Sequence, residues 1–584
     1  MLSTIDDPSN LRALPDEMLG DVADSLRRRL IELGSMNGGH FGASLGVVEL
    51  TVALHAVFDT PHDRIVWDVG HQAHGHKILT GRREAMTRIK KANGPAGFLR
   101  RSESSYDAFG AGHAGTSISA ALGMAEAASR QGIDRYAVAV IGDGAATSGL
   151  SFEALNHAPT LSTALRVVLN DNGMSIAPGT GGLHSTGDFR GYVEALGWRY
   201  LGPVDGHDLP ALLKAVAELR MGEGPALLHV KTRKGCGYGP AEKDPYAWHA
   251  TAPFDIETGA RGTKTKSPMT WTDCFAECLA RIADRDDRVV AITAAMPDGT
   301  GLDRFAERHP DRVYDVGIAE QHAVTFAAGL AAEGLRPVCA IYSTFLQRAF
   351  DQVIHDVALQ DLPVVFAIDR AGLVGADGPT HHGAFDLSYL RTIPNLVVAA
   401  PRNANDLQHL LATAVDSGRP FAIRYPRGSV RGCLTDPDPK SIPIGQGELL
   451  REGGDVALVA LGKAVDEALL AAEELARQGI EASVVDARFA KPLDARLIRR
   501  VAALTGRLVT IEDHVLAGGF GSALTELISS GSSPALSRVE VIRLGLPDRF
   551  VEHAEASEQW REAGIDHPAI VAAVRASLCK GSPK

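Results

Sequence analysis

The sequence predicts an α/β protein built from three consecutive domains with mostly parallel sheets. Short runs of β-branched and apolar residues alternate with amphipathic helical stretches along the chain, which is typical of parallel strands covered by helices. The chain has 584 residues, and this is too long for one hydrophobic core, because domains usually contain about 100–200 residues. Two polar stretches without periodicity also divide the chain into three blocks.

The two dividing stretches predict the domain boundaries. The first is Glu257–Pro268 (ETGARGTKTKSP), and the second runs from about Gly428 to Gly447. Both are polar and lack the spacing of a helix or a strand, as linkers do. The sequence therefore predicts domains at residues 1–260, 268–430 and 445–584.

Continuous apolar runs predict strands that are buried on both faces. The predicted strands of the first block are Tyr136–Ile141, Leu165–Leu169 and Ala226–Val230, and those of the second are Val289–Thr293, Val338–Tyr342, Val364–Asp369, Leu396–Ala400 and Phe421–Pro426. The third block opens with a βαβ unit: strand Asp455–Leu461, a helix with apolar Val465, Ala468, Leu469, Ala472 and Leu475 that Gly479 ends, and strand Ala482–Val485.

Composition narrows the class of protein. Hydrophobic residues make up 45% and charged residues 22% of the chain, as in ordinary globular proteins. The net charge of −12 argues against nucleic acid or an anionic membrane as partner. The six cysteines form no CxxC pair, and no signal peptide or stretch of about 20 apolar residues is present. We expect a cytoplasmic protein.

The strongest local signal lies at residues 141–174. One predicted strand ends in Ile141-Gly142-Asp143-Gly144, and the next ends in Asn170-Asp171-Asn172-Gly173-Met174. Ligands of open α/β sheets bind at the carboxyl ends of strands. Aspartate, asparagine and a backbone carbonyl are oxygen ligands that suit Mg²⁺, while the glycines and a helix N-terminus suit a diphosphate. The alternative is a simple strand-to-helix turn at GDG.

A second signal lies in the second block. The string Asp315-Val-Gly-Ile-Ala-Glu320-Gln-His322 places Glu320 at the start of a predicted helix directly after a strand. A carboxyl group in this position is a candidate for acid–base chemistry. The alternative is a glutamate that only complements the helix dipole.

Many further strings, in this order, complete a family resemblance. They are His40–Gly46 (HFGASLG), Asp68–Ala73 (DVGHQA), His76–Arg83 (HKILTGRR), Gly112–Ser117 (GHAGTS), Gly202–Asp208 (GPVDGHD), Ala241–Pro245 (AEKDP), Gly375–Asp386 (GADGPTHHGAFD), Arg424–Gly428 (RYPRG) and Asp486–Asp494 (DARFAKPLD). Together with GDG and GIAEQH they resemble the 1-deoxy-D-xylulose-5-phosphate synthase family of transketolase-like enzymes, over nearly the whole chain from about Gly38.

The resemblance implies a transketolase-like fold that binds thiamine diphosphate and Mg²⁺. Asp143, Asn172 and the Met174 carbonyl would then hold the metal ion. Glu320 would be the carboxylate that activates the cofactor, and Phe345 would support its ring. Further implied cofactor contacts are His71, His113, Gly142, Gly144, Ala145 and Lys243.

The resemblance also implies the substrates, pyruvate and D-glyceraldehyde 3-phosphate, and a product that feeds isoprenoid, thiamine and pyridoxal biosynthesis. The phosphate of the acceptor needs cationic partners, and the planar fork of arginine suits it. Arg370 and Arg427 follow predicted strands and are the expected phosphate ligands, with Tyr342 and Arg348 as helpers. The alternative is that both arginines only form ion pairs.

Four residues are the expected groups for proton transfer and substrate contact. His40, His249 and His381 lie in strings that match the family, and histidine can exchange protons at neutral pH. Asp377 neighbours His381 in the GADGPTHHGAFD string. The family also implies a homodimer.

The chain departs from the family pattern in one notable segment. The stretch from Met174 to Gly202 is shorter than in most members, and Gly173 stands where glutamate is common. The departure leaves open a specialised relative with another aldehyde acceptor. A transketolase and a non-catalytic relative are also compatible with the resemblance, although Asp143, Asn172 and Glu320 are all present, as catalysis requires.

Overall fold

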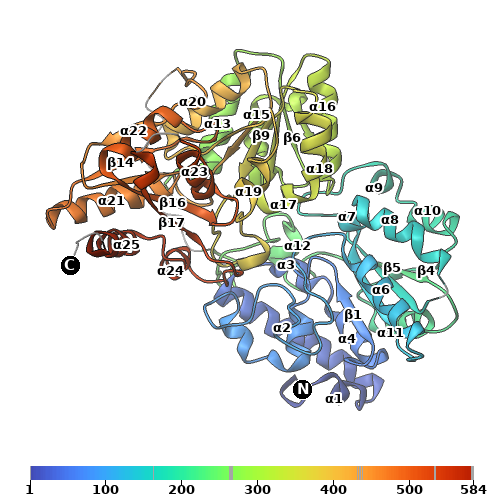
Figure 1. The fold of residues 1–584 in the computed structure, drawn as a ribbon. Helices are drawn as coiled ribbons and strands as arrows, with labels where there is room; N and C mark the ends of the chain where they lie inside the picture. The colour runs from blue at the N-terminus through green and yellow to red at the C-terminus, as the bar shows by residue number, and fades with distance from the viewer. Residues whose placement is uncertain are drawn as a thin grey trace. The chain divides into compact units, whose positions relative to one another are not determined.

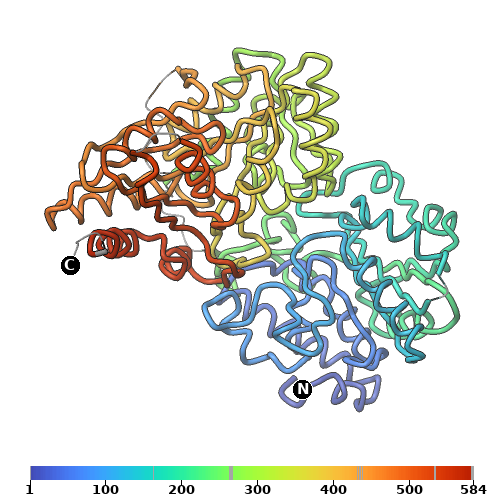
Figure 2. The backbone as a smooth tube through the Cα atoms, viewed as in Figure 1, coloured from blue at the N-terminus to red at the C-terminus, as the bar shows by residue number. Residues whose placement is uncertain are grey.

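The computed structural model describes residues 2–161, 163–261, 268–430, 432, 436, 438–531 and 535–580. The chain forms two compact units. The N-terminal unit is Met1–Thr265 with Gly317–Ala319, and the C-terminal unit is Lys266–Val316 with Glu320–Lys584. In Figures 1 and 2 the N-terminal unit is the blue-to-green part of the chain, and the yellow-to-red part belongs to the C-terminal unit.

The N-terminal unit is built on a five-stranded parallel sheet of order β1-β2-β3-β5-β4. Its strands are Arg64–Trp67 (β1), Ala137–Gly142 (β2), Leu165–Asp171 (β3), Arg199–Asp205 (β4) and Ala226–Lys231 (β5). Its helices are Pro8–Arg12 (α1), Leu19–Asn37 (α2), Phe41–Leu45 (α3), Val48–Val57 (α4), His74–Lys77 (α5), Ser117–Arg130 (α6), Asp143–Ala146 (α7), Gly149–His157 (α8), Gly182–Thr186 (α9), Phe189–Ala195 (α10), Leu209–Arg220 (α11) and Gly239–Lys243 (α12).

Helices cover both faces of this sheet. Alternate residues of β2 enter two different cores: Val138 and Val140 pack with α2, α4 and α11, whereas Ala139 and Ile141 pack with α6, α8 and α10. Successive side chains of a strand point to opposite faces, so a strand covered on both sides must be apolar throughout. This explains the continuous run YAVAVI.

The C-terminal unit contains two further sheets. The seven-stranded sheet has the order β15-β10-β11-β9-β8-β6-β7, and the five-stranded sheet has the order β12-β14-β13-β16-β17. The strands of the first are Val289–Thr293 (β6), Val313–Asp315 (β7), Arg336–Tyr342 (β8), Val365–Asp369 (β9), Val397–Ala399 (β10), Phe421–Arg424 (β11) and Phe489–Lys491 (β15). Those of the second are Glu448–Arg451 (β12), Val456–Ala460 (β13), Ala482–Asp486 (β14), Arg507–Val515 (β16) and Glu540–Leu546 (β17).

The helices of the C-terminal unit precede, connect and follow these strands along the chain (Figure 1). They are Trp271–Ala283 (α13), Pro297–Thr300 (α14), Leu302–Arg308 (α15), Glu320–Ala332 (α16), Ser343–Leu346 (α17), Phe350–Gln352 (α18), Asp386–Leu390 (α19), Ala404–Asp416 (α20), Ala464–Arg477 (α21), Ala495–Thr505 (α22), Phe520–Ser529 (α23), Ala556–Glu562 (α24) and His567–Lys580 (α25). The predicted α/β class with mostly parallel sheets is confirmed. None of the described helices combines the length and apolar character that crossing a membrane requires.

The predicted division into three domains can be compared with the sheets. Each predicted block contains one sheet, but β15 from the third block pairs antiparallel with β10 of the second. The second and third sheets belong to the same compact unit. The predicted linkers include residues 262–267, 431, 433–435 and 437, which lie outside the described residues. The three-domain division stays a prediction.

A buried ion-pair network joins the second and third sheets. Arg424, at the end of β11, donates from Nε to Asp386 (3.0 Å) and from Nη1 to Asp513 in β16 (2.8 Å). All three side chains are buried. Removing one partner from such a network leaves buried charges without compensation, so Arg424 couples the two halves of this unit.

A second buried network lies in the N-terminal unit and gives a pH-dependent prediction. Asp107 accepts two hydrogen bonds from the Arg82 guanidinium, both 2.8 Å, and one from His76 (3.2 Å). Burial alone would raise the pKa of Asp107, but the hydrogen bonds from His76 and Arg82 outweigh it and hold the pKa well below its ordinary value. A carboxylate with a lowered folded-state pKa stabilises the fold above the unfolded pKa of about 4, and loses this effect as the pH falls.

We therefore expect Asp107→Asn to lower the melting temperature at pH 7 by several degrees, since breaking a buried pair costs about 3–5 kcal/mol. The difference from the wild type should shrink between about pH 5 and pH 3. Differential scanning calorimetry across this range measures it, with exposed Asp24→Asn on α2 as control. A difference that stays constant with pH would contradict the assigned charge.

Candidate functional site

The two motif ends in the N-terminal unit lie side by side. Asp143 directly follows β2, and Asn172 directly follows β3. The two strands are parallel neighbours, and Gly142 is paired with Asn170 in their register. The structure thus brings Asp143 and Asn172 to the same edge of the sheet, as the spacing predicts.

Asp143 is a buried carboxylate that directly follows β2. Neither of its side-chain oxygens has a hydrogen-bond partner within the described part of the chain. Burial, reinforced by the negative charge of Asp171, raises the pKa of Asp143 to about 7, although the backbone N–H group of Asn172 opposes the rise. The His184 ring approaches the carboxylate, with its Nδ1 3.5 Å from Oδ2. A buried carboxylate in this condition needs a cation.

The surroundings of Asp143 fit a metal-bound diphosphate. A Cβ on Gly144 would lie 2.0 Å from the Ser175 Oγ, so any larger residue there would require Ser175 to move. The Asn172 side chain is half-buried, and its Oδ1 accepts the Met174 N–H group (3.0 Å). The described residues contain no cluster of three or more His, Cys, Asp or Glu side chains suited to a metal ion, so the expected ligand set combines one carboxylate with amide and carbonyl oxygens, as Mg²⁺ accepts.

The neighbouring residues of β3 are already engaged. Asn170 is buried and accepts a hydrogen bond from Thr232 (2.5 Å). Asp171 pairs with His229 (2.8 Å) and with Lys231. These contacts fix the strand end, and Asn172, whose Oδ1 accepts one backbone N–H group, directly follows it.

Three predicted histidines form one cluster in the N-terminal unit. The ring centroids of His40, His71 and His249 lie 5.3–6.0 Å apart. Burial lowers the pKa of His71 to about 3 and holds the pKa values of His40 and His249 well below the ordinary value. The Nδ1 atom of each ring is buried and has no hydrogen-bond partner among the described residues. The neutral rings can therefore donate or accept hydrogen bonds with a ligand.

Lys234, which none of the sequence motifs contains, lies near Asp143. It is buried and its Nζ donates to the Ser175 carbonyl (2.8 Å). Burial lowers the pKa of Lys234 to about 8, and the nearby Asp143 carboxylate opposes this. Predicted Lys243 is exposed at the end of α12. The signal that could have revealed Lys234 is its position just after the end of β5, at the same sheet edge as Asp143.

His113 lies in the loop before α6, and Asp68 hydrogen-bonds the backbone of this loop. Asp68 accepts the backbone N–H groups of Gly115 (2.8 Å) and Ser117 (2.9 Å). His113 is half-buried in this loop, and Ala145 is buried in α7. The assignments of His113, Ala145 and Lys243 to cofactor contacts stay predictions.

Glu320 in the C-terminal unit is also a buried carboxyl group with an unsatisfied oxygen. It starts α16 and is 4% exposed. Its Oε2 has no hydrogen-bond partner among the residues described, and the Arg348 Nη1 lies 3.5 Å from it. Burial raises the pKa of Glu320, and the Arg348 charge opposes the rise. The raised pKa favours a carboxyl group that can share a proton with a ligand.

Aromatic rings and His381 form a second cluster in this unit. Tyr342 ends β8 and stacks on Phe345 at a centroid distance of 5.6 Å. Phe345 in turn meets the His381 ring edge-on at 5.6 Å. The Nδ1 atom of His381 lies 2.8 Å from the Thr380 hydroxyl oxygen, which helps to orient the ring. Phe345 and His381 are half-buried, so a ligand can reach both.

The two predicted phosphate ligands lie at the ends of neighbouring parallel strands, β9 and β11. Arg370 has a φ of +58° and its Nη1 donates to Asp369 (2.8 Å) and Thr272 (2.7 Å). Its guanidinium also lies over the Tyr342 ring. Arg427 is exposed, donates to the Val374 carbonyl (3.0 Å) and lies 3.4 Å from Asp377. Both arginines are thus positioned by acidic neighbours.

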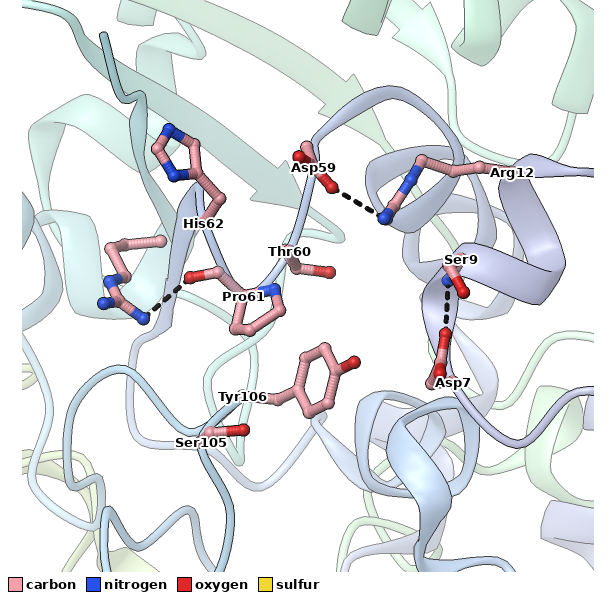
Figure 3. Close-up of a pocket in the computed structure, with 10 residues that line it drawn as sticks. Asp7, Ser9, Arg12, Asp59, Thr60, Pro61, His62, Ser105 and Tyr106 are labelled. Carbon is pink, nitrogen blue, oxygen red and sulfur yellow. Dashed lines mark hydrogen bonds and ion pairs between the residues drawn. The ribbon is translucent and has the colours of Figure 1, made fainter. Parts of the chain in front are cut away.

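A surface hollow elsewhere in the N-terminal unit contains none of the predicted site residues (Figure 3). It has a volume of about 580 Å³ and is lined by Asp7, Ser9, Arg12, Asp59, Thr60, Pro61, His62, Arg64, Ser105 and Tyr106. Arg12 pairs with Asp59 (2.6 Å), and Arg64 donates to the Pro61 carbonyl (2.7 Å). Asp7 accepts the Ser9 N–H group (2.7 Å), so the lining combines both signs of charge.

Family models match nearly the whole chain. Residues 2–188 match the model described as 1-deoxy-D-xylulose-5-phosphate synthase. The other matches are the transketolase thiamine diphosphate binding domain (residues 105–277), pyrimidine binding domain (residues 267–432) and C-terminal domain (residues 445–570).

Curated relatives carry the same family description over their full length. The chain is 49% identical to 1-deoxy-D-xylulose-5-phosphate synthase 1 of Geobacter sulfurreducens, over 100% of this chain and 98% of that protein. It is 51% identical to the synthase of Thermomicrobium roseum, over 99% and 98%. Among solved structures, the transketolase of Leishmania mexicana is 19% identical over 97% of this chain and 98% of that chain, with a TM-score of 0.45.

Proposed function

Because the chain belongs to the 1-deoxy-D-xylulose-5-phosphate synthase family, we propose specific roles for its buried polar residues in that reaction. The enzyme decarboxylates pyruvate and joins the remaining two-carbon unit to D-glyceraldehyde 3-phosphate, giving 1-deoxy-D-xylulose 5-phosphate and CO₂. It is a transferase that uses thiamine diphosphate and Mg²⁺. The observation that carries the role assignment is the buried Asp143 carboxylate, whose oxygens have no hydrogen-bond partner among the described residues.

The residues of the N-terminal unit hold the metal-bound diphosphate. Asp143, Asn172 and the Met174 carbonyl supply the oxygen ligands that Mg²⁺ prefers. Lys234 adds a positive charge close to the same carboxylate. The glycine backbone at Gly142 and Gly144 allows close approach of a diphosphate, because a side chain at Gly144 would collide with Ser175.

We assign to Glu320 the contact that activates the cofactor. When bound, thiamine diphosphate supplies a carbanion at its thiazolium C2 atom and an electron sink for decarboxylation. The buried Glu320 carboxyl group, with its raised pKa, is suited to hydrogen-bond a ring nitrogen of the aminopyrimidine and so promote proton removal. Phe345 provides an apolar surface for the ring, and Arg348 keeps Glu320 oriented.

The histidines and arginines act on the two substrates. His40, His71 and His249 are neutral by burial, and we assign to His40 and His249 the transfer of protons at the reacting oxygens. His381 and Asp377 contact substrate from the C-terminal unit, with Tyr342 beside Phe345. Arg370 and Arg427 hold the acceptor phosphate, because their guanidinium groups suit its planar bidentate recognition.

Two further proposals concern the state of the enzyme in the cell. We propose a homodimer in the cytoplasm, supported by the family assignment. Exposed apolar side chains on the C-terminal unit, including Phe350 and Ile354 one helical turn apart, also fit a subunit interface. Sedimentation equilibrium of the purified chain tests the dimer.

Product analysis tests the function itself. Purified protein is incubated with pyruvate, D-glyceraldehyde 3-phosphate, thiamine diphosphate and Mg²⁺, and the product is identified by mass spectrometry and NMR. Formation of 1-deoxy-D-xylulose 5-phosphate supports the assignment. Release of CO₂ without this product would indicate that the acceptor is another aldehyde. Turnover with a ketose donor in place of pyruvate would indicate transketolase chemistry.

A further inference from the structure

The short segment between β3 and β4 carries a histidine to the Asp143 carboxylate. This segment contains α9, and His184 is its third residue. The His184 Nδ1 lies 3.5 Å from the Asp143 Oδ2, and the side chain is 9% exposed. Its second ring nitrogen, Nε2, is also buried and has no hydrogen-bond partner in the part of the chain that is described. The two unsatisfied groups, carboxylate and imidazole, thus lie next to each other.

The local sequence holds the imidazole in this position. A Cβ on Gly179 would lie 2.5 Å from atoms of the His184 ring, so the ring occupies space that glycine leaves open. Phe189 meets the same ring edge-on at a centroid distance of 6.2 Å. Gly187 adopts a left-handed conformation (φ 65°) and ends α9, a conformation that glycine adopts at little cost.

We propose that His184 is a further cofactor-binding residue, which contacts the diphosphate of the metal-bound cofactor beside Asp143. The inference rests on the proposed function, because it requires that Asp143 holds this group. Imidazole is a good donor to anionic oxygens, and such charge-assisted hydrogen bonds are stronger than neutral ones. Mg²⁺ prefers oxygen ligands, so the ring binds diphosphate oxygen in preference to the metal ion.

The inference gives the short segment a role in cofactor binding. The alignment with the Geobacter sulfurreducens relative is 629 positions long, whereas this chain has 584 residues, so that relative carries residues without a counterpart here. In this chain the connection from β3 to β4 consists of α9, α10 and their turns. Within this connection His184 lies against the strand-end carboxylate of Asp143.

Equilibrium binding tests this role without relying on turnover. Isothermal titration calorimetry at saturating Mg²⁺ gives Kd for thiamine diphosphate and, separately, for inorganic pyrophosphate, which contains only the group that His184 would contact. His184→Phe keeps a ring but removes both nitrogens, and we expect it to weaken both ligands about tenfold or more, the effect of one hydrogen bond to a charged group. His184→Gln keeps a polar amide and should lose less affinity.

A control variant and the binding of the wild type distinguish failure of this inference from failure of the proposed function. His157→Phe changes an exposed histidine at the end of α8 and should leave both Kd values unchanged. If the wild type binds thiamine diphosphate and His184→Phe binds it equally or more tightly, the inference is wrong. If the wild type itself does not bind thiamine diphosphate with Mg²⁺, the proposed function fails instead. Circular dichroism confirms that each variant is folded. If His184→Phe does not fold, the Kd values of His184→Gln decide whether the inference holds.

Discussion

Replacing Glu320 by alanine is expected to lower kcat for product formation by about 10²–10⁴-fold, the usual contribution of a positioned acid–base group. Glu320 is buried, and its Oε2 has no hydrogen-bond partner among the described residues. Burial raises the pKa of this carboxyl group, which suits proton exchange with a ring nitrogen. Exchange of the thiazolium C2 proton for deuterium, followed by NMR, should slow in the same proportion, because this measurement isolates the activation step from substrate binding.

Matched variants make the Glu320 result specific. Glu333 lies one residue beyond α16 and is exposed, so Glu333→Ala should leave kcat unchanged. Glu320→Gln keeps the shape of the side chain but loses the acid, and it should be nearly as impaired as the alanine variant. The assignment is wrong if Glu320→Ala retains activity within about threefold of the wild type while binding the cofactor normally.

Replacing Asp143 by asparagine is expected to have two effects of opposite sign. Loss of the charged ligand should weaken binding of Mg²⁺ and thiamine diphosphate more than about 100-fold, since even changes to residues that only hydrogen-bond a metal ligand cost about 10–100-fold. The cofactor-free protein should become more stable. Because burial raises the pKa of Asp143 to about 7, its charge destabilises the fold increasingly as the pH rises above about 4, and the neutral amide removes this penalty of a few kcal/mol.

Thermal melts at pH 8 with and without thiamine diphosphate and Mg²⁺ measure both effects. The wild type should gain melting temperature on addition of the ligands, as any protein does that binds a ligand in its folded state. Asp143→Asn should have a higher melting temperature than the wild type without ligands, and the ligands should raise it only a little. Asp134→Asn, at an exposed position of the same unit, serves as control. The assignment of Asp143 to the metal site is wrong if Asp143→Asn melts at a lower temperature than the wild type without ligands and is still stabilised when they are added.

The fold can be predicted where strands are buried on both faces. The predicted strands Tyr136–Ile141 and Val289–Thr293 correspond to β2 and β6 almost residue for residue, because a fully covered strand must be a continuous apolar run. The edge strands β4 and β17 are not predicted. Their sequences, RYLGPVD and EVIRLGL, contain glycine or charged residues and are largely accessible, so neither an apolar run nor strict alternation marks them.

Site residues can be predicted from the sequence where their position depends on a nearby strand or helix end. Asp143 directly follows the buried strand β2, and Glu320 starts helix α16. A run of apolar residues followed by such a residue marks a strand or helix end in the sequence, where ligands of α/β sheets bind. Lys234 and His184 are not predicted, because their contacts are with residues far away in the sequence, Ser175 and Asp143. The spacing of residues along the sequence does not show which distant residues come into contact.

The pairing of β15 with β10 bears on how this polypeptide can be cut for expression. A fragment that ends near residue 430 would lose Phe489–Lys491 and leave the apolar strand Val397–Ala399 at the border of its sheet. Exposed backbone N–H and C=O groups on such a border invite pairing with another copy. Such a truncated fragment should therefore aggregate, and a fragment that restores these three residues by fusion should stay dispersed.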